Sequence, residues 1–402
     1  MKFLIISNTC SKREFEYIQN LKFTEKISPQ QNYLSMLISG LESNADVEKI
    51  DCISVRSLAE SNCNIKYLKR KNESVSDKVS YIYTTVCTKN IFRNFVNFIE
   101  VYKEVKRYLN NYDIQKKDYV AIIDPLSFDS AIGACIALKG FLKIGIVTDL
   151  PIHIGQIGKY NGKLSKFKSY IKHKLFMNIV NDFQAYCYLT SAMKIIGKNK
   201  PYCVVEGMVP CNTNNNTKIN KSNKKIVLYA GGLYEKFGIN NLIQAANEIR
   251  NIDFELHLYG EGPCINYINE VNKINKNIKY RGVTSVDNIK MAEREATLLV
   301  NPRPCEEEYT KYSFPSKTLE YMSSGRPVLT TKLKGIPDDY YHYLYTIENN
   351  DVQTIKEALV TILNKPMNEL NIKGIVACEF VNKYKNAKVQ AQKIIKMVEE
   401  VK

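Results

Sequence analysis

The chain has 402 residues, of which 45% are hydrophobic and 24% are charged, and its formal net charge is +16. This length is too great for one ordinary core and predicts two domains of about 200 residues each. No apolar run approaches the roughly 18 residues that a membrane-spanning helix needs, so the sequence predicts no transmembrane segment.

The N-terminal stretch Met1-Lys-Phe-Leu-Ile-Ile-Ser7 has too short an apolar core for a signal peptide and predicts a buried first strand. Eleven cysteines are scattered with no Cys-x-x-Cys pair, and the four histidines lie far apart along the chain. These spacings favour reduced core cysteines in a cytoplasmic protein and predict no metal site.

The positive charge leaves three alternatives open. A lysine-rich composition could raise the charge over the whole solvated surface, or a basic patch could bind an anionic membrane or nucleic acid. The sequence contains no RNP motif or zinc finger, so we expect no nucleic-acid partner.

Short β-rich runs alternate with helical patterns, which is typical of parallel sheets with crossover helices. In the first half, strands are predicted at Lys2–Ser7, Val47–Val55, Tyr119–Asp124, Ile144–Thr148 and Phe183–Thr190. The helices between them are predicted at Gln30–Leu41, Ile91–Leu109 and Ser130–Lys139. The stretch from Cys211 to Lys225 is polar and has no periodicity, which predicts a linker.

A second alternating series begins directly after this linker. Its strands are predicted at Ile226–Ala230, Phe254–Tyr259, Ile278–Tyr280, Thr297–Asn301 and Pro327–Thr331, with helices that begin at Ile239 and near Ser316. We therefore predict an α/β protein of two Rossmann-like, doubly wound parallel-sheet domains that face each other across a cleft at the carboxyl ends of their strands. The predicted parts are a first domain at 1–207, a linker at 208–225, a second domain at 226–381, and a C-terminal helix at 382–402 that could cross back to the first domain.

The most informative stretch is Tyr312-Ser-Phe-Pro-Ser-Lys-Thr-Leu-Glu320. Pro315 and Ser316 predict the start of a helix, and the free N–H groups of Ser316 and Lys317 would lie at the positive end of its dipole, where a phosphate binds well. Glu320 follows Ser316 by four residues and faces the same side about 6 Å further along. This spacing suits a diphosphate followed by a ribose.

Two glycine-rich turns follow predicted strands. The first, Gly231-Gly-Leu-Tyr-Glu-Lys236, could let a ligand approach the backbone beneath a lysine. The second contains Gly260 and Gly262 and could contact a nucleobase. Each turn taken alone could equally be an ordinary connection between a strand and a helix.

In combination, these motifs resemble the C-terminal donor domain of family 4 glycosyltransferases, which are retaining enzymes of the GT-B fold that use nucleotide sugars. The resemblance is close over about residues 224–335 and also includes Tyr280-Arg-Gly282 and Asn301-Pro302. Within the family, the chain looks most like bacterial enzymes of capsule, exopolysaccharide or lipopolysaccharide synthesis. Ile146-Val-Thr-Asp149 and Pro201-Tyr-Cys-Val-Val-Glu-Gly207 in the first half are also similar to that group.

The resemblance implies roles for single residues. Glu320 falls on the second glutamate of the family's Glu-x7-Glu motif and would bind the donor ribose. Lys236 would hold the departing diphosphate, together with the amides of Ser316 and Lys317. The donor contacts would also include the loops at Gly231, Gly232, Gly260 and Gly262.

The sequence departs from the family pattern at three places. Tyr312 stands where the first glutamate is expected, and Gly232 stands where an arginine is frequent. The family's His-Asp pair appears as Thr148-Asp149, with His153 four residues on, which makes Asp149 the catalytic candidate of the first domain. These departures affect the sugar and phosphate contacts.

The expected reaction is hexosyl transfer from a nucleotide diphosphate sugar with retention of configuration. The sequence shows no evident protein nucleophile, so departure and attack are expected on one face, and the leaving diphosphate would help to take the acceptor proton. No Asp-x-Asp motif is present, so basic side chains are expected to act without a metal or other cofactor.

Tyr160–Val180 carries five lysines among apolar residues and could lie on an anionic membrane as a helix. The alternative is an ordinary helix that packs on the first sheet. Membrane docking would suit a glycan acceptor linked to polyprenyl diphosphate, and the protein would then be cytoplasmic and peripheral at the inner face of the membrane.

Three other functions remain open. A sugar-nucleotide epimerase would share the fold but needs acid/base residues in its cleft. A catalytically silent nucleotide-sugar-binding partner would explain Tyr312 and Gly232. A nucleic-acid-binding protein would explain the charge but not the order of the motifs.

Overall fold

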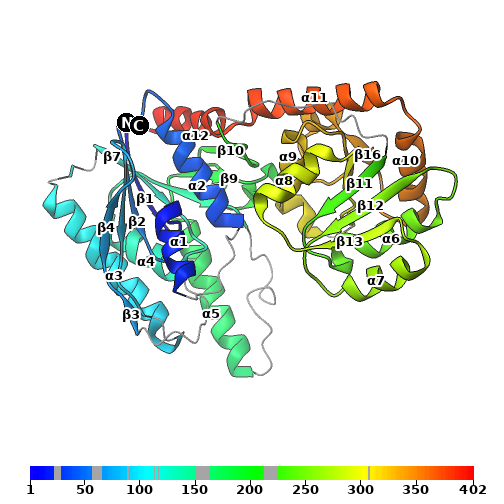
Figure 1. The fold of residues 1–402 in the computed structure, drawn as a ribbon. Coiled ribbons are helices and arrows are strands. Elements are labelled where there is room, and N and C mark those ends of the chain that lie inside the picture. Colours follow the sequence, from blue (N-terminus) through cyan, green and yellow to red (C-terminus); the bar gives the residue numbers. More distant parts are fainter. Residues whose placement is uncertain are drawn as a thin grey trace. The chain divides into compact units, whose positions relative to one another are not determined.

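The computed structural model of the chain describes residues 1–21, 29–56, 66–87, 90–112, 114–115, 117–149, 163–211, 224–306 and 308–402. It divides into two compact units, Met1–Cys211 with Ala387–Lys402, and Asn212–Asn386. Each unit is a parallel sheet with helices against it (Figure 1). His153 and most of the predicted linker lie outside the described residues.

The first unit contains an eight-stranded sheet in the order β10-β9-β8-β7-β1-β2-β5-β4. All neighbouring strands run parallel except β4, which pairs antiparallel with β5 at the edge. A separate two-stranded sheet pairs β3 with β6. The strands are β1 Lys2–Ser7, β2 Lys49–Ser54, β3 Tyr67–Leu68, β4 Lys71–Ser74, β5 Val79–Tyr83, β6 Val86–Cys87, β7 Tyr119–Ile123, β8 Lys143–Val147, β9 Ala185–Tyr188 and β10 Tyr202–Val204.

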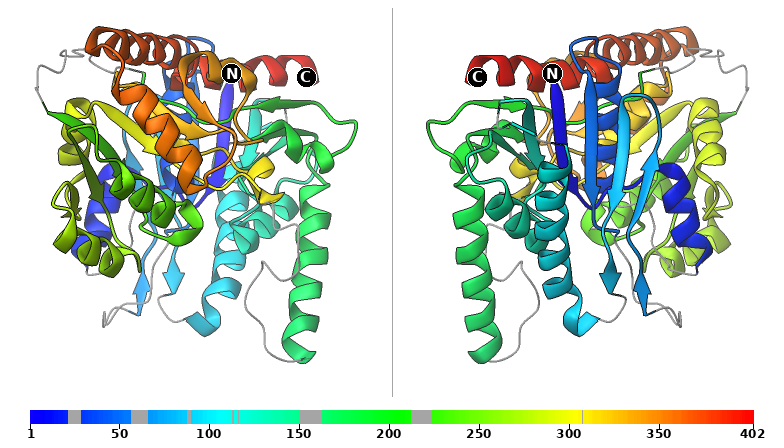
Figure 2. Two further views of the ribbon diagram at one scale, coloured as in Figure 1. Left: turned by 90° about the vertical axis from the view of Figure 1, so that its right-hand side faces the viewer. Right: turned by 90° about the vertical axis from the view of Figure 1, so that its left-hand side faces the viewer.

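The helices of this unit are α1 Lys12–Asn20, α2 Pro29–Glu42, α3 Asn90–Asn111, α4 Phe128–Ala137, α5 Lys163–Val180 and α12 Ala387–Val401, with a short 3-10 helix at Ser191–Ile195. Helix α4 packs against both α3 and α5 (Figure 2). Within the described ranges, no helix is long and apolar enough to cross a membrane.

The five strands and three helices predicted for the first half are confirmed, with shifts of one or two residues at most ends. The prediction missed α1 and strands β3 to β6, as well as β10. Strand β4 has the polar sequence Lys-Asn-Glu-Ser, because an edge strand with two partly exposed faces needs no apolar alternation.

The C-terminal helix α12 belongs to the first unit, where it packs against α2 (Figure 1). Gly40 of α2 allows this contact, because a Cβ there would lie 2.1 Å from the carbonyl oxygen of Ala387. The C-terminal helix predicted at 382–402 is wrong in its extent, because α11 (Met367–Tyr384) ends within that range and α12 begins only at Ala387. Between α11 and α12, Asn386 donates its side-chain amide to the Asn382 carbonyl, and Ala387 donates its N–H to the Val209 carbonyl.

The second unit contains a six-stranded parallel sheet in the order β13-β12-β11-β14-β15-β16. Its strands are β11 Lys225–Ala230, β12 Phe254–Tyr259, β13 Ile278–Gly282, β14 Leu298–Asn301, β15 Val328–Thr331 and β16 Tyr345–Ile347. Its remaining helices are α6 Ile239–Glu248, α7 Ile265–Ile274, α8 Val286–Glu295, α9 Ser316–Ser323 and α10 Val352–Leu363, with 3-10 turns at Glu235–Phe237, Glu308–Tyr312 and Asp338–Tyr343. The five strands predicted here are confirmed, while β16 was missed.

A buried apolar cluster unites β11, β12, α6, α7 and α10 of this unit. The strand order changes direction around β11, because β12 and β13 lie on one side of it and β14 to β16 on the other. In a doubly wound sheet, the crevice at the carboxyl ends of the strands next to this point is the place for a ligand.

Candidate functional site

Helix α9 is held against the carboxyl end of β11 by hydrogen bonds to Ala230. The Ala230 amide donates to the Tyr321 hydroxyl at 2.9 Å, and the Lys317 ammonium donates to the Ala230 carbonyl. The start of α9 therefore lies at the strand end where a ligand is expected.

The two glycine-rich turns meet at the same strand end. A Cβ on Gly231 would lie 2.7 Å from Cε and 2.9 Å from Nζ of Lys317. Gly260 has a φ of +125°, and a Cβ on it would lie 1.9 Å from the Gly231 carbonyl oxygen. The structure thus brings Gly231, Gly260 and Lys317 together. Only glycine fits at Gly260, because its φ is positive and the Gly231 backbone lies against it.

Gly232 and Gly262 lie on the same two turns. The Gly232 carbonyl accepts a hydrogen bond from Tyr229 at 3.0 Å, and a Cβ on Gly262 would lie 2.2 Å from the Leu233 carbonyl oxygen. Gly262 therefore allows the β12 turn to pack closely on the β11 turn, whereas Gly232 is surrounded by Tyr234 and Phe237 of its own turn.

The N-terminus of α9 has no side-chain cap, because Pro315 precedes the first helical residue and makes no capping hydrogen bond. Ser316 is exposed there, Lys317 is half-buried, and Glu320 is exposed one turn later. An uncapped helix N-terminus with a nearby ammonium is an anion-binding arrangement, and Glu320 is accessible to a hydroxyl-bearing ligand.

Lys236 lies in the 3-10 turn after β11, and its Nζ lies 5.5 Å and 5.3 Å from the ring centroids of Tyr234 and Phe237. The guanidinium of Arg303 lies 5.4 Å from the same Phe237 ring. Two cations therefore flank the turn that carries Gly232. Sequence reasoning missed Arg303, although its position directly after β14, in Asn301-Pro302-Arg303, could have indicated it.

A buried carboxyl group, Glu293 of α8, lies within electrostatic range of Glu320 and Lys317. Burial, with the Glu320 charge, raises the pKa of Glu293 to about 7, although Lys317, Lys290 and Arg294 act in the opposite direction. Its side chain is only 5% exposed, whereas a helical glutamate is ordinarily solvated. The sequence carried no signal for it, because a glutamate between Ala292 and Arg294 looks like part of a polar helix face.

Tyr312 ends the 3-10 turn before α9 and is 9% exposed, with the Lys311 ammonium 4.9 Å from its ring centroid. A packed phenol ring therefore occupies the position at which the family resemblance implies a carboxylate.

Asp149 lies in the first unit, two residues beyond the end of β8, and is exposed. The neighbouring strand β7 is followed by a second carboxyl group, Asp124, which is 2% exposed. Burial raises the pKa of Asp124 to about 6, against the effect of hydrogen bonds from Leu126 and Ser127. Sequence reasoning missed Asp124 by including it in the predicted strand.

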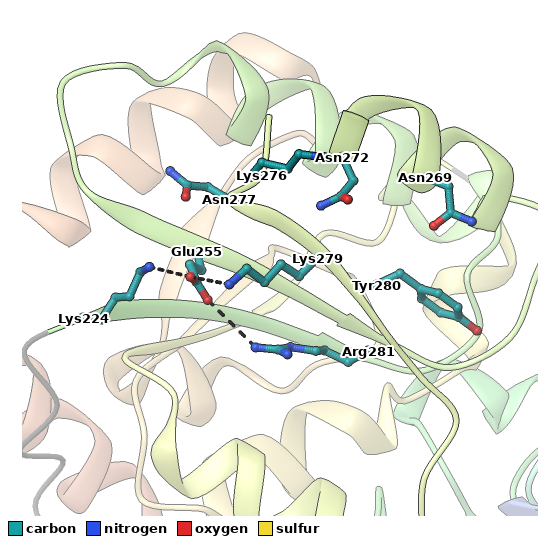
Figure 3. A pocket seen from close by; sticks show the side chains of 9 residues that line it. All are labelled: Lys224, Glu255, Asn269, Asn272, Lys276, Asn277, Lys279, Tyr280 and Arg281. Atoms are coloured by element: carbon teal, nitrogen blue, oxygen red, sulfur yellow. Dashed lines mark hydrogen bonds and ion pairs between the residues drawn. The ribbon is translucent and has the colours of Figure 1, made fainter. Parts of the chain in front are cut away.

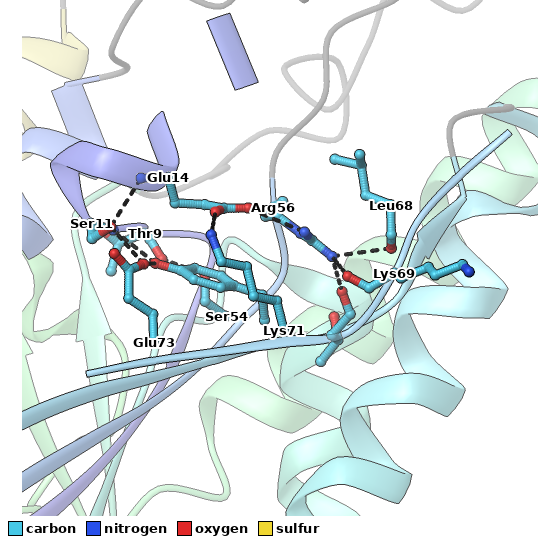
Figure 4. A network of polar contacts seen from close by, with 11 residues as sticks. Thr9, Ser11, Glu14, Ser54, Arg56, Leu68, Lys69, Lys71 and Glu73 are labelled. Atoms are coloured by element: carbon cyan, nitrogen blue, oxygen red, sulfur yellow. Dashed lines mark hydrogen bonds and ion pairs between the residues drawn. The ribbon is translucent and has the colours of Figure 1, made fainter. Parts of the chain in front are cut away.

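Further along the same edge, a buried polar network joins the ends of β1, β2 and β5 (Figure 4). Glu14 of α1 is fully buried and pairs with Arg56 at 3.1 Å and Lys71 at 2.5 Å. Ser11 and Tyr83 donate to Glu73 at 2.8 Å and 2.9 Å. Both Glu14 oxygens hold a cation, so this group anchors the edge and is not available as a base. In the described part of the chain, no group of three or more His, Cys, Asp or Glu could hold a metal ion.

Comparisons with known proteins give a family match for part of the chain and a shared fold for the whole chain. Residues 224–365 match the family model described as glycosyl transferases group 1. A sequence search of curated proteins finds no match.

Three solved structures align over the whole chain. A sucrose-phosphate synthase from Thermosynechococcus elongatus has a TM-score of 0.66 at 14% identity and covers 100% of this chain and 99% of its own. A trehalose-6-phosphate protein from E. coli bound with UDP-2-fluoro glucose has a TM-score of 0.67 at 9% identity, with coverage of 100% and 99%. Anabaena HepE in complex with UDP has a TM-score of 0.61 at 12% identity and 100% coverage of both chains. The chain therefore has the GT-B fold predicted from its sequence, and residues 224–365 match the group 1 glycosyl transferases.

Proposed function

We propose that this chain transfers a hexosyl unit from a nucleotide diphosphate sugar to an acceptor hydroxyl with retention of configuration. The observation that carries the proposal is the meeting of Gly231, Gly260 and Lys317 beside the uncapped start of α9, with Glu320 exposed one turn on. This arrangement offers an anion cradle and a carboxylate at the spacing of a diphosphate and a ribose.

The proposed chemistry uses charge at the strand ends of the second unit. Lys317 and the α9 N-terminus would hold the diphosphate, and Lys236 and Arg303 would stabilise the negative charge that develops as it leaves. Arg303 would supply the positive charge that is missing because Gly232 stands where an arginine is frequent in the family. Glu320 would accept hydrogen bonds from the ribose hydroxyls, and the basic groups would make a metal or other cofactor unnecessary.

The donor is best sought first among uridine diphosphate sugars, because two of the similar structures contain UDP or UDP-2-fluoro glucose. Asp149 and Asp124 would face the acceptor, since both follow neighbouring strands of the first unit. We propose a glycan acceptor, free or linked to polyprenyl diphosphate, in the synthesis of a bacterial capsule, exopolysaccharide or lipopolysaccharide.

Helix α5 supports a peripheral position at the inner face of the membrane. Tyr170, Ile171 and Leu175 on it are 52%, 43% and 45% exposed, and Lys174 beside them is also exposed. Phe176 and Val180 are buried, so the end of α5 packs on the first unit while apolar side chains remain at the surface. Such a basic and apolar face fits an anionic membrane.

The decisive experiment incubates the purified full chain with a panel of UDP-, GDP-, dTDP- and ADP-sugars and measures nucleotide release with and without glycan acceptors. One donor should be turned over, and NMR of the product should show the anomeric configuration of the donor. Turnover with inversion would contradict the retaining mechanism. If the chain neither binds nor turns over any of the donors, the whole proposal is wrong.

A second function is a catalytically silent nucleotide-sugar-binding partner. It is favoured by the buried Tyr312 in place of a carboxylate and by the contact of Lys317 with a backbone carbonyl. In that case the donor panel would show binding without turnover.

A further inference from the structure

The second unit has another pocket, away from the strand ends that form the proposed donor site. It lies along the edge strand β13, between α7, the first residues of β12 and the residue before β11 (Figure 3). Its volume is about 630 Å³, and its lining consists of Lys224, Glu255, Asn269, Asn272, Lys276, Asn277, Lys279, Tyr280 and Arg281. This volume is within the roughly 300–1,000 Å³ of small-molecule pockets, but the lining is polar.

Charge is unevenly distributed in this pocket. Four basic side chains line it, and Glu255 is its one carboxylate. Lys279 and Arg281 project from the same face of β13, two residues apart, while Lys276 precedes the strand. The pocket therefore has an excess of positive charge, and a bound anion would relieve the repulsion between its cations.

Glu255 contacts three of the four cations, Lys224, Lys279 and Arg281, and offsets only one of their positive charges. The carboxylate is 5% exposed and accepts hydrogen bonds from the ammonium groups of Lys224 and Lys279 at 2.5 Å each. Nε2 of His257 lies 2.7 Å from it, and the guanidinium of Arg281 lies 3.9 Å from it. Burial acts to raise the pKa of Glu255, but the hydrogen bonds from Lys224, Lys279 and His257 outweigh it and lower the pKa to about 2. The single negative charge of Glu255 thus fixes the positions of several basic side chains at one wall of the pocket.

The asparagine side chains extend the donor capacity of the lining. Asn272 uses its amide on the Ile278 carbonyl at 2.5 Å, which fixes the turn between α7 and β13. Asn269 and Asn277 are at the opposite ends of the α7 wall and carry amides of their own (Figure 3). Lysine, arginine and amide donors around a cavity suit the several acceptor oxygens of a phosphate group.

We propose that this pocket binds a phosphate-bearing small molecule at a site separate from the nucleotide. The ligand carries its phosphate or diphosphate between Lys276, Lys279 and Arg281. Glu255 orients Lys279 and Arg281 before the ligand arrives. This proposal does not depend on the glycosyltransferase activity. The alternative role of these lysines is structural, because lysines on an edge strand prevent the strand from pairing with another chain. The following experiment distinguishes this role from anion binding.

The test is calorimetric titration of the full chain with inorganic phosphate and with inorganic diphosphate, in a buffer free of other multivalent anions. The variant Lys276→Gln with Arg281→Gln removes two pocket cations that are exposed enough to tolerate substitution. The control variant, Lys273→Gln with Lys334→Gln, removes the same charge from exposed positions of the same unit outside the pocket. We expect the pocket variant to weaken diphosphate binding about tenfold or more, because each lost hydrogen bond to a charged group corresponds to such a factor, and the control to bind normally.

Equal weakening in both variants would mean general attraction to a basic protein, and unchanged binding in the pocket variant would place the anion elsewhere. Either result overturns the proposal. The proposal is also wrong if neither phosphate nor diphosphate binds the wild type. Flotation with phosphatidylglycerol vesicles separates the two sources of phosphate. If the pocket variant loses vesicle binding while soluble diphosphate does not bind the wild type, the site recognises a membrane surface and the small-molecule proposal is wrong.

Discussion

Lys236 is the residue on which the proposed chemistry depends most. Its ammonium lies in the turn after β11, near the rings of Tyr234 and Phe237. Lys236→Ala should reduce kcat by about 100-fold or more, because a preorganised charge that stabilises a leaving group contributes on this scale. Steady-state kinetics with the best donor measures this, with Lys273→Ala as the control, and a near-normal rate would contradict the assignment.

Arg303 offers a second test at the same turn. Its guanidinium shares the Phe237 ring with Lys236, so Arg303→Ala should lower kcat about tenfold or more through the loss of a charged hydrogen-bond donor. Arg303→Lys keeps the charge and should retain part of the activity. If Arg303→Ala turns over donor at the wild-type rate, Arg303 does not compensate for Gly232.

Glu293 predicts a pH dependence of donor binding. Its pKa is raised to about 7 by burial and by the Glu320 charge, so the group is neutral below that pH and ionised above it. The groups that face it are Glu320, Lys317 and Tyr321 of α9 and Lys290 and Arg294 of its own helix. Ionisation adds negative charge beside the phosphate-binding Lys317, so the donor KM of the wild type should rise several-fold above pH 7.

The matched variant is Glu293→Gln, which keeps the shape of the neutral acid and cannot ionise. Its donor KM should stay flat over the same pH range, and kcat should change less than KM. Parallel pH profiles for the two proteins would show that Glu293 is only a packed residue.

At the scale of elements, the packing of α12 against α2 attaches the C-terminal end of the chain to the first unit. Gly40→Ala would normally stabilise a helix, because glycine is the more costly residue there by about 0.5–1 kcal/mol. Here the new methyl group would meet the Ala387 carbonyl at 2.1 Å, so α12 must shift. We expect the free energy of unfolding to fall by about 1–3 kcal/mol, the usual cost of overpacking.

Denaturant unfolding, followed by circular dichroism, measures this effect. Ser35→Ala on an exposed position of α2 is the control, and it should leave stability unchanged or slightly raised. A stabilised Gly40→Ala protein would mean that α12 does not lie against α2 at this position in solution.

At the scale of the whole molecule, the basic composition and the exposed face of α5 predict membrane association. Flotation with phosphatidylglycerol vesicles should show binding that weakens as salt is raised. Ile171→Ser with Leu175→Ser should reduce this binding about tenfold, because two half-exposed apolar side chains are lost from the contact. Val283→Ser with Val286→Ser, at exposed positions of the other unit, is the control. Without salt-sensitive binding, α5 serves only in packing.

The sequence alone was sufficient to predict the two alternating series of strands and helices and the start of α9 at Ser316. These features are local, because apolar runs, glycines and prolines act on their own stretch of chain. The same local signals identified Gly231, Gly260 and Lys317, although not that a Cβ on either glycine would collide with its neighbour.

Only the tertiary structure decided which distant residues meet. Arg303 reaches the turn of Lys236 from another strand, and Glu293 is buried beside Glu320 although its own helix looks polar. The split between α11 and α12, the edge strand β4 and the cation pocket around Glu255 also depend on contacts between segments far apart in the chain. Burial and electrostatic neighbourhood are properties of the packed fold, so a pattern read along one stretch of sequence cannot contain them.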